Sequence, residues 1–210
     1  MQRMTQTVEE KDQAEAQGTA FQLASIVEKA KAGSRTAFEQ LMGHFHEDIF
    51  RMVYYRTRSS MDAEDLTQEI FTRAYKNISG LKDVERFRSW LYQIALNRVR
   101  DFNRRKRFRN LFSAFGDTPE TAKTPVDASH PPDALDHLMA RDFWKQVELF
   151  LDKLSRTERE VFSLRFMDHL SIKEISQTLG RSESTIKTHL YRSIGKFKAD
   201  HSMHQLLQEK

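Results

Sequence analysis

The sequence of 210 residues contains no cysteine, which excludes a disulfide framework and any metal site built on thiolates. This absence fits a reducing compartment. No stretch of 18 consecutive apolar residues occurs, and residues 1–11 carry charge without an apolar segment, so neither a transmembrane helix nor a secretory signal is indicated. We therefore expect a soluble, cytoplasmic protein without membrane insertion.

Proline is also scarce, and all four prolines fall in one stretch. That stretch, 110–138, is polar and acidic and shows no apolar periodicity, which predicts a flexible linker. Residues 1–20 have few large apolar side chains to offset the entropy of ordering. We expect them to form a mobile N-terminal tail.

The remaining length suits two small domains, at 21–109 and 139–200, followed by a C-terminal tail at 201–210. Strand-type alternation is missing from both domains, and apolar residues recur instead at helical spacing. The predicted fold class is therefore all-α, with two small helical domains of about four helices each joined by the linker.

In the N-terminal domain, turn and cap signals divide the apolar pattern into four helices. The first stops at Gly33, the third begins at Asp62 as its N-cap and stops at Gly80, and the fourth runs from about Arg86 to Arg107. The side chains expected in the core of the last three helices are Phe38, Leu41, Met42, Phe45, Ile49, Val53, Leu66, Ile70, Phe71, Ala74, Ile78, Phe87, Leu91, Ile94, Ala95 and Val99.

The C-terminal domain carries the pattern of a helix-turn-helix. Capping boxes at Ser155/Glu158 and Ser171/Glu174 each begin a helix. The second of these helices reaches Leu179, Gly180 supplies positive φ for a tight turn, and Ser182 caps a further helix to about Phe197. The expected core of the helix-turn-helix consists of Ile175, Leu179, Ile186, Leu190 and Ile194. An earlier helix of this domain carries Phe143, Val147, Phe150, Leu151 and Leu154.

The outward side of the last helix offers cationic and hydroxyl groups to a DNA major groove. The residues on that side are Arg181, Ser184, Lys187, Thr188, Tyr191 and Arg192. A solvated polar helix face is the alternative interpretation, because helix-turn-helix patterns also arise by chance.

Acidic and amide side chains gather on the third helix of the N-terminal domain. These are Asp62, Glu64, Asp65, Gln68 and Glu69, which we call the α-acidic patch. Residues three and four apart share a helix side, so the patch forms one surface. Taken alone, acidic residues near a helix start are explained as well by the helix macrodipole.

The fourth helix joins aromatic residues at its start to dense positive charge at its end. Aromatic side chains beside arginines suit single-stranded DNA. Asn97 and Asp101 lie one turn apart and can bond base edges, whereas the cations that can neutralise phosphates are Arg98, Arg100, Arg104, Arg105, Lys106, Arg107 and Arg109. Trp90 can instead be an ordinary core residue, and a basic run at a helix end is favoured by the dipole and often merely solvated.

Other functional classes find less support. The net charge of +4 permits a nucleic-acid partner without requiring one. A helix-turn-helix regulator would usually carry a receiver or ligand-binding domain, for which the N-terminal domain shows no strands. No Glu-x-x-His or His-x-x-x-His pair indicates a helical metalloenzyme, and His44 and His46 point to different helix sides. We predict no enzyme activity, no cofactor and no metal site.

These motifs together resemble the extracytoplasmic-function (group IV) sigma factors of the sigma-70 family of bacterial RNA polymerase subunits. The segment 62–69 resembles region 2.2, the segment 87–97 resembles regions 2.3 and 2.4, and the segment from Leu154 with the helix-turn-helix resembles region 4. The resemblance spans about Val27 to Lys198 apart from the linker.

The resemblance implies a transcription initiation factor and assigns a role to each surface. The α-acidic patch would dock on the clamp helices of the polymerase β′ subunit, and region 4 would reach the β flap. Lys187, Thr188, Tyr191 and Arg192 match positions that contact the −35 promoter element.

By the same resemblance, the loop from Ser79 to Glu85 would hold a flipped-out base. The residues expected to contact the −10 element and assist DNA melting are Phe87, Trp90, Asn97, Arg100, Asp101, Arg104 and Arg105. Several relatives carry asparagine where this chain has Asp101, and a carboxylate there would prefer a cytosine amino group or a nearby arginine. An anti-sigma factor is the expected regulatory partner.

Overall fold

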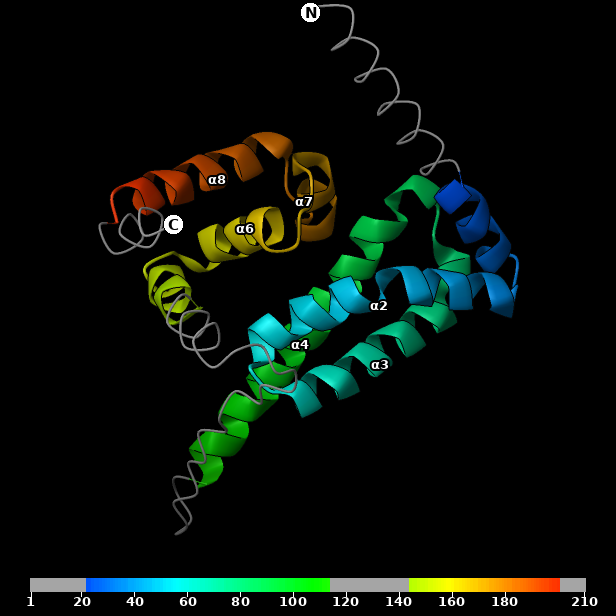
Figure 1. The fold of residues 1–210 in the computed structure, drawn as a ribbon, viewed down its shortest axis with the longest axis horizontal. Coiled ribbons are helices and arrows are strands. Elements are labelled where there is room, and N and C mark those ends of the chain that lie inside the picture. Colours follow the sequence, from blue (N-terminus) through cyan, green and yellow to red (C-terminus); the bar gives the residue numbers. More distant parts are fainter. Residues whose placement is uncertain (1–21, 114–143, 201–210) are drawn as a thin grey trace, which may run out of the picture. The chain divides into compact units, whose positions relative to one another are not determined.

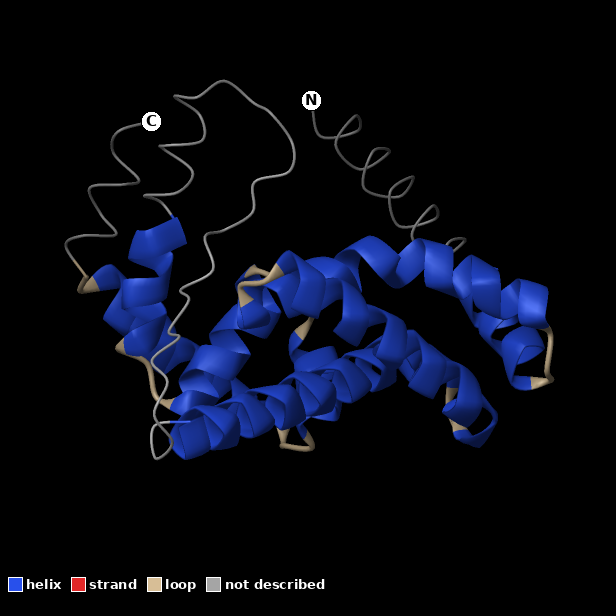
Figure 2. Ribbon diagram, turned by 90° about the horizontal axis from the view of Figure 1, so that it is seen from below, coloured by secondary structure: helices blue, strands red, loops and turns tan. Residues whose placement is uncertain are grey.

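The computed structural model describes residues 22–113 and 144–200. The predictions for both tails and for most of the linker lie outside these residues. Within them every regular element is a helix, and the chain divides into two compact units (Figures 1 and 2). None of the described helices is long and apolar enough to cross a bilayer. The predicted all-α class with two helical domains is confirmed.

The N-terminal unit begins with a helix over 22–31. This helix ends at Gly33, whose φ of 97° lets the Ser34 amide donate to the carbonyl of Lys29. Three longer segments follow: α2 (Arg35–Thr57), α3 (Ser60–Asn77) and α4 (Phe87–Ser113). Two short 3₁₀ turns, Ile78–Gly80 and Val84–Arg86, connect α3 to α4.

The core of the N-terminal unit follows the predicted apolar stripes with two differences. Met42 is 38% exposed rather than buried, because it lies about 100° around α2 from Leu41, which together with Phe45 already faces the core. Ile94 is half-buried. The other predicted core residues are buried, and the ring of Phe45 packs against Phe87 with centroids 5.5 Å apart.

The boundaries of α3 and α4 also differ from the prediction. α3 begins at Ser60, three residues earlier than an N-cap at Asp62 predicts, so Asp62 lies inside the first turn and is not the N-cap. α4 continues to Ser113 because no proline or glycine interrupts the basic segment after Arg107. Four residues assigned to the linker are therefore helical.

The C-terminal unit contains a helix over 144–152, then α6 (Arg156–Phe166), α7 (Ile172–Leu179) and α8 (Glu183–Lys198). Both predicted capping boxes are formed, at Ser155/Glu158 and at Ser171/Glu174. An aromatic cluster joins three of the helices: Phe150 lies 5.2 Å from Phe162 and 5.3 Å from Phe197, between ring centroids. α6, α7 and α8 all pack on one another (Figure 1).

The helix-turn-helix is present as predicted. Gly180 adopts φ 62° and ψ 40°, and the Ser182 hydroxyl caps α8 by accepting from the Thr185 amide. Ile175 and Ile186 are fully buried and Leu190 is 8% exposed, whereas Leu179 and Ile194 are half-buried. Ile186 and Leu190 mark the inward side of α8, so the opposite side of this helix faces outward.

Candidate promoter and polymerase interfaces

The six residues predicted for the outward side of α8 and the turn before it are all exposed. Tyr191 is 70% exposed. Thr188 donates its hydroxyl to the carbonyl of Ser184 at 2.9 Å, which leaves the hydroxyl oxygen able to accept. Lys187 and Arg192 supply the charge. This side therefore combines long cations, an aromatic ring and hydroxyls, as base and phosphate contacts require.

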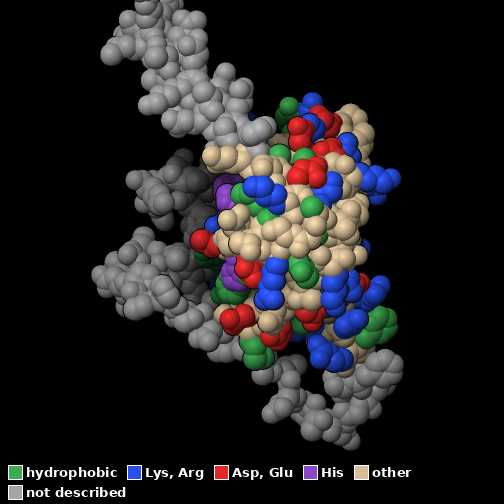
Figure 3. All heavy atoms as spheres, turned by 90° about the vertical axis from the view of Figure 1, so that its right-hand side faces the viewer, with side chains coloured by type: hydrophobic (Ala, Val, Ile, Leu, Met, Phe, Trp, Pro, Cys, Tyr) green, Lys and Arg blue, Asp and Glu red, His purple; other side chains and the backbone are tan. Residues whose placement is uncertain are grey.

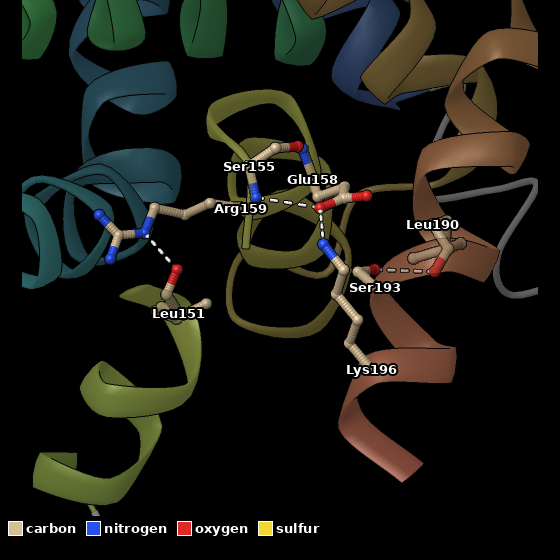
Figure 4. Close-up of polar contacts among 7 residues, drawn as sticks. All are labelled: Leu151, Ser155, Glu158, Arg159, Leu190, Ser193 and Lys196. Atoms are coloured by element: carbon tan, nitrogen blue, oxygen red, sulfur yellow. Dashed lines mark hydrogen bonds and ion pairs between the residues drawn. The ribbon is translucent and has the colours of Figure 1, made fainter. Parts of the chain in front are cut away.

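A partly buried ion pair joins α8 to the start of α6 (Figure 4). Glu158 is 5% exposed and accepts from the Lys196 ammonium at 2.6 Å and from the Ser155 amide at 2.9 Å. The hydrogen bond from Lys196, followed by that from the Ser155 backbone, lowers the pKa of Glu158 from 4.5 to about 2. Lys196 itself is half exposed, so solvent weakens the attraction.

We expect Glu158→Gln to destabilise the C-terminal unit by about 1 kcal/mol at neutral pH, because glutamine keeps the cap but loses the charge that attracts Lys196. A carboxylate whose folded pKa is lowered contributes stability above pH 4.5, and this contribution is lost as the pH falls toward 2. The variant should therefore lose less stability than wild type across that window. Denaturant unfolding followed by Trp144 fluorescence in a Trp90→Phe background measures this unit alone.

Lys196→Met is the matched control for that pair. If the ion pair acts as described, the double variant will be no less stable than the more destabilised single variant. Additive losses would show that Glu158 and Lys196 act separately.

The α-acidic patch is an exposed surface of α3. Glu64, Asp65, Gln68 and Glu69 are exposed, whereas Asp62 is half-buried and lies 3.8 Å from the ammonium of Lys106 on α4. Since α3 begins at Ser60, Asp62 is the acidic residue of the first turn, and the other members lie beyond it. The macrodipole acts within the first turn and accounts for Asp62 alone.

Met61 adds an apolar group to this surface that sequence analysis missed. Its side chain is 73% exposed at positions i−3 and i−4 relative to Glu64 and Asp65, on the same side of α3. Helical spacing from the acidic residues would have revealed the position. Exposed methionines are common in protein-binding surfaces.

On α4, the side chains predicted to read the −10 element are engaged with arginines one turn further along. Asn97 accepts from Arg100 at 3.4 Å, and Asp101 accepts from Arg104 at 3.1 Å. Asn97, Arg104 and Arg105 are exposed, and Arg100 and Asp101 are half-buried. Each acceptor is thus paired with an arginine three residues further along the same helix.

Phe87 and Trp90 do not share one environment. Phe87 is 1% exposed and belongs to the core, so the expected direct contact of its ring with DNA finds no support in the structure. Trp90 is half-buried and packs on Phe87, with centroids 5.8 Å apart. Phe87 thus supports the ring of Trp90, which is the aromatic group at this end of α4 with a solvent-facing part.

Arg98 also departs from its predicted role. It is 6% exposed and forms an ion pair with Glu69 of α3, so it is not available to neutralise a phosphate. The basic run on the surface starts later: Arg104, Arg105, Lys106, Arg107 and Arg109 are exposed, with Phe108 57% exposed among them. Figure 3 shows how unevenly charge is spread over one face, with Lys and Arg side chains gathered toward its lower part.

The loop before α4 is held by local bonds. Leu81 is buried, and the Asp83 carboxylate accepts from the Glu85 amide at 3.0 Å and pairs with Arg86 at 3.0 Å. Ser79, Lys82 and Glu85 remain exposed. The loop therefore presents polar side chains from a backbone held by local bonds, just before α4 begins.

Comparison with known proteins decides what these surfaces belong to. The sequence model of Sigma-70 region 2 matches residues 41–109, and that of Sigma-70 region 4 matches residues 144–196. The chain is 31% identical over 172 residues to the ECF RNA polymerase sigma factor SigW of Bacillus subtilis, covering 79% of this chain and 89% of SigW. The chain belongs to the extracytoplasmic-function (ECF) group of the sigma-70 family. It is a transcription initiation factor.

Another relative of this ECF sigma factor is BldN of Streptomyces coelicolor, an ECF RNA polymerase sigma factor with 33% identity over 176 residues. That match covers 82% of this chain and 63% of BldN, so the chain spans less than two thirds of this relative. The ECF sigma-E factor of Escherichia coli is 24% identical over 173 residues, which cover 80% of this chain and 88% of the sigma-E factor.

Two solved structures share the fold of this sigma factor. CnrH, in complex with the cytosolic domain of CnrY, has a TM-score of 0.61 at 23% identity, covering 84% of this chain and 95% of that chain. The sigma factor RpoE, in complex with the anti-sigma factor NepR from Bartonella quintana, has a TM-score of 0.54 at 21% identity, covering 81% and 96%.

The regulator alternative loses its basis at this point. A helix-turn-helix regulator that never enters polymerase does not account for a region 2 match over most of α2, all of α3 and most of α4. In the part of the chain that the structure describes, no group of three or more His, Asp or Glu side chains is placed to hold a metal ion.

Proposed function

We propose that three exposed surfaces of this ECF sigma factor divide the work of initiation. The outward side of α8, carried by Lys187, Thr188, Tyr191 and Arg192, binds the −35 element in the major groove. The side of α3 around Asp65 docks on the clamp helices of the polymerase β′ subunit. α4 and the loop before it contact the −10 element and stabilise the melted strand.

The observation that carries this proposal is the separation of charge within the N-terminal unit. Glu64 and Asp65 lie exposed on α3, whereas the exposed basic run lies on the second half of α4. An acidic surface suits a basic protein partner, and a basic helix with exposed aromatic groups suits a DNA strand. Met61 beside the acidic residues supplies the apolar contact that a protein interface needs.

At the −10 element, Trp90 and the polar loop 79–85 are the proposed site for an unpaired base. A base leaving the stack loses a few kcal/mol of stacking and pairing, which contact with an aromatic ring and hydrogen bonds replaces. Asp101 bonds Arg104, as expected for a carboxylate near an arginine. We infer that the pair presents a guanidinium as well as a carboxylate to the DNA, which changes the base preference relative to asparagine.

Regulation by an anti-sigma factor is part of the same proposal. It is supported by membership of the ECF group and by the exposed surfaces on both units, which such a partner can cover. The proposed place of action is the bacterial cytoplasm, where polymerase and promoter DNA are found.

The direct test is in vitro transcription with core RNA polymerase on a pool of genomic promoter fragments, with and without the protein, followed by sequencing of transcript starts. We expect protein-dependent starts that share −35 and −10 elements at fixed spacing. The absence of such starts, together with sequence-specific DNA binding by the protein alone, would contradict the proposal.

A further inference from the structure

Two ion pairs join α3 to α4 along one seam. Asp62 pairs with Lys106, and Glu69 pairs with Arg98. The lower-numbered residue of α3 meets the higher-numbered residue of α4, so the two helices run antiparallel along the seam. Two of the five members of the α-acidic patch therefore contact the proposed promoter-binding helix within the same molecule.

The Glu69–Arg98 pair is the more deeply buried of the two, because its arginine is shielded from solvent whereas Lys106 is not. Arg98 is 6% exposed, and its Nε has no hydrogen-bond partner among the described residues, so the bond to Glu69 is the charged contact that the structure gives this guanidinium. Removing a charge from water is costly, and a buried arginine without its anion is strongly destabilising. Arg98 stays buried because Glu69 reaches it from the edge of α3.

This arrangement places Arg98 next to the residues proposed to face DNA. Asn97 precedes it, and Asp101 follows three residues later on the same helix. Any rotation of α4 that brought Arg98 to solvent would turn both side chains by the same angle, since a helix rotates as one body. The burial of Arg98, together with that of Ala95 and Val99 on the same helix, thus fixes the rotational setting of Asn97 and Asp101.

We propose that Glu69 is a positioning residue for the promoter-binding helix, and that polymerase docking on α3 rests on Glu64, Asp65 and Gln68. The proposal deepens the function proposed above and depends on it. Glu69, held against Arg98, sets the face that α4 turns toward the −10 element. The α-acidic patch then divides into residues that bind a partner and residues that orient a neighbouring helix.

The experiment compares Glu69→Gln with Asp65→Lys in two measurements on the full chain. The first is affinity for core polymerase, and the second is promoter opening at saturating polymerase, followed by permanganate reactivity of unpaired thymines. For Glu69→Gln we expect polymerase affinity within about twofold of wild type and promoter opening reduced about tenfold, since the uncharged amide holds the Arg98 guanidinium less strongly than the carboxylate does. For Asp65→Lys we expect lower polymerase affinity but promoter opening close to wild type once polymerase is saturating.

The charge swap Glu69→Arg with Arg98→Glu tests whether the pair itself matters, and it should recover promoter opening beyond either single change. Circular dichroism checks that each variant keeps its helices. Loss of polymerase affinity equal to that of Asp65→Lys, or unchanged promoter opening in Glu69→Gln, would overturn the positioning role. Failure of the function itself is separate, because wild type would then give no protein-dependent starts.

Discussion

Reversing the charge at Asp65 is expected to lower affinity for core polymerase at least about tenfold, because a like charge placed against a basic partner surface costs several kcal/mol. Asp65 is exposed and lies beyond the first turn of α3, so Asp65→Lys should change the free energy of unfolding by no more than about 0.5 kcal/mol. Co-purification with polymerase and a binding titration measure the loss.

Glu47→Lys is the matched control for Asp65→Lys. It makes the same change of charge at an exposed position on α2, outside the α-acidic patch. Equal loss of polymerase binding by both variants would attribute the effect to net charge. Binding by Asp65→Lys as strong as wild type would remove the docking surface from the proposal and return the acidic residues to a purely local role.

The second large effect is expected at the other end of the chain. Lys187→Ala with Arg192→Ala should weaken binding to promoters that carry the −35 element by roughly 2–6 kcal/mol, about 1–3 for each lost contact. The dependence of binding on salt should also become shallower, since fewer counterions are released from DNA. Footprinting over a salt series, on promoters defined by their transcript starts, measures both quantities.

Lys145→Ala with Arg156→Ala removes the same two kinds of cation from exposed positions outside the helix-turn-helix. This control should leave the −35 footprint unchanged, and neither double variant should alter co-purification with polymerase. If the two double variants weaken binding equally, the outward side of α8 has no special role.

Most helix ends that carried a cap residue or a glycine were predictable, although the predicted cap Asp62 lies inside α3. Gly33 and Gly180 adopt positive φ at the predicted stops, and Ser155, Ser171 and Ser182 cap the helices they precede. Arg58 and His169 also adopt positive φ, at 58° and 54°. Arginine does not favour that conformation and histidine adopts it only more often than most residues, so neither residue type predicts a helix end as glycine does.

The direction of polar side chains was harder to predict than the helices themselves. Arg98 belongs to a basic run by composition, and only the position of α3 shows that it faces inward. Phe87 satisfied both the core pattern and the aromatic pattern of a DNA site, and its burial decides for the core. The outward side of α8 was predictable because Ile186 and Leu190 mark the opposite side at regular spacing.

α4 is one unbroken helix of 27 residues, which makes it a rod of about 40 Å at 1.5 Å per residue. One turn of B-DNA advances about 34–36 Å, so the rod is longer than a full turn of the duplex. The unbroken helix therefore fixes both the distance between Trp90 and the basic end and the rotation about the helix axis that separates them. Inserting a single alanine between Arg100 and Arg104 would turn the basic end by 100° relative to Trp90 and put the two ends out of phase on DNA.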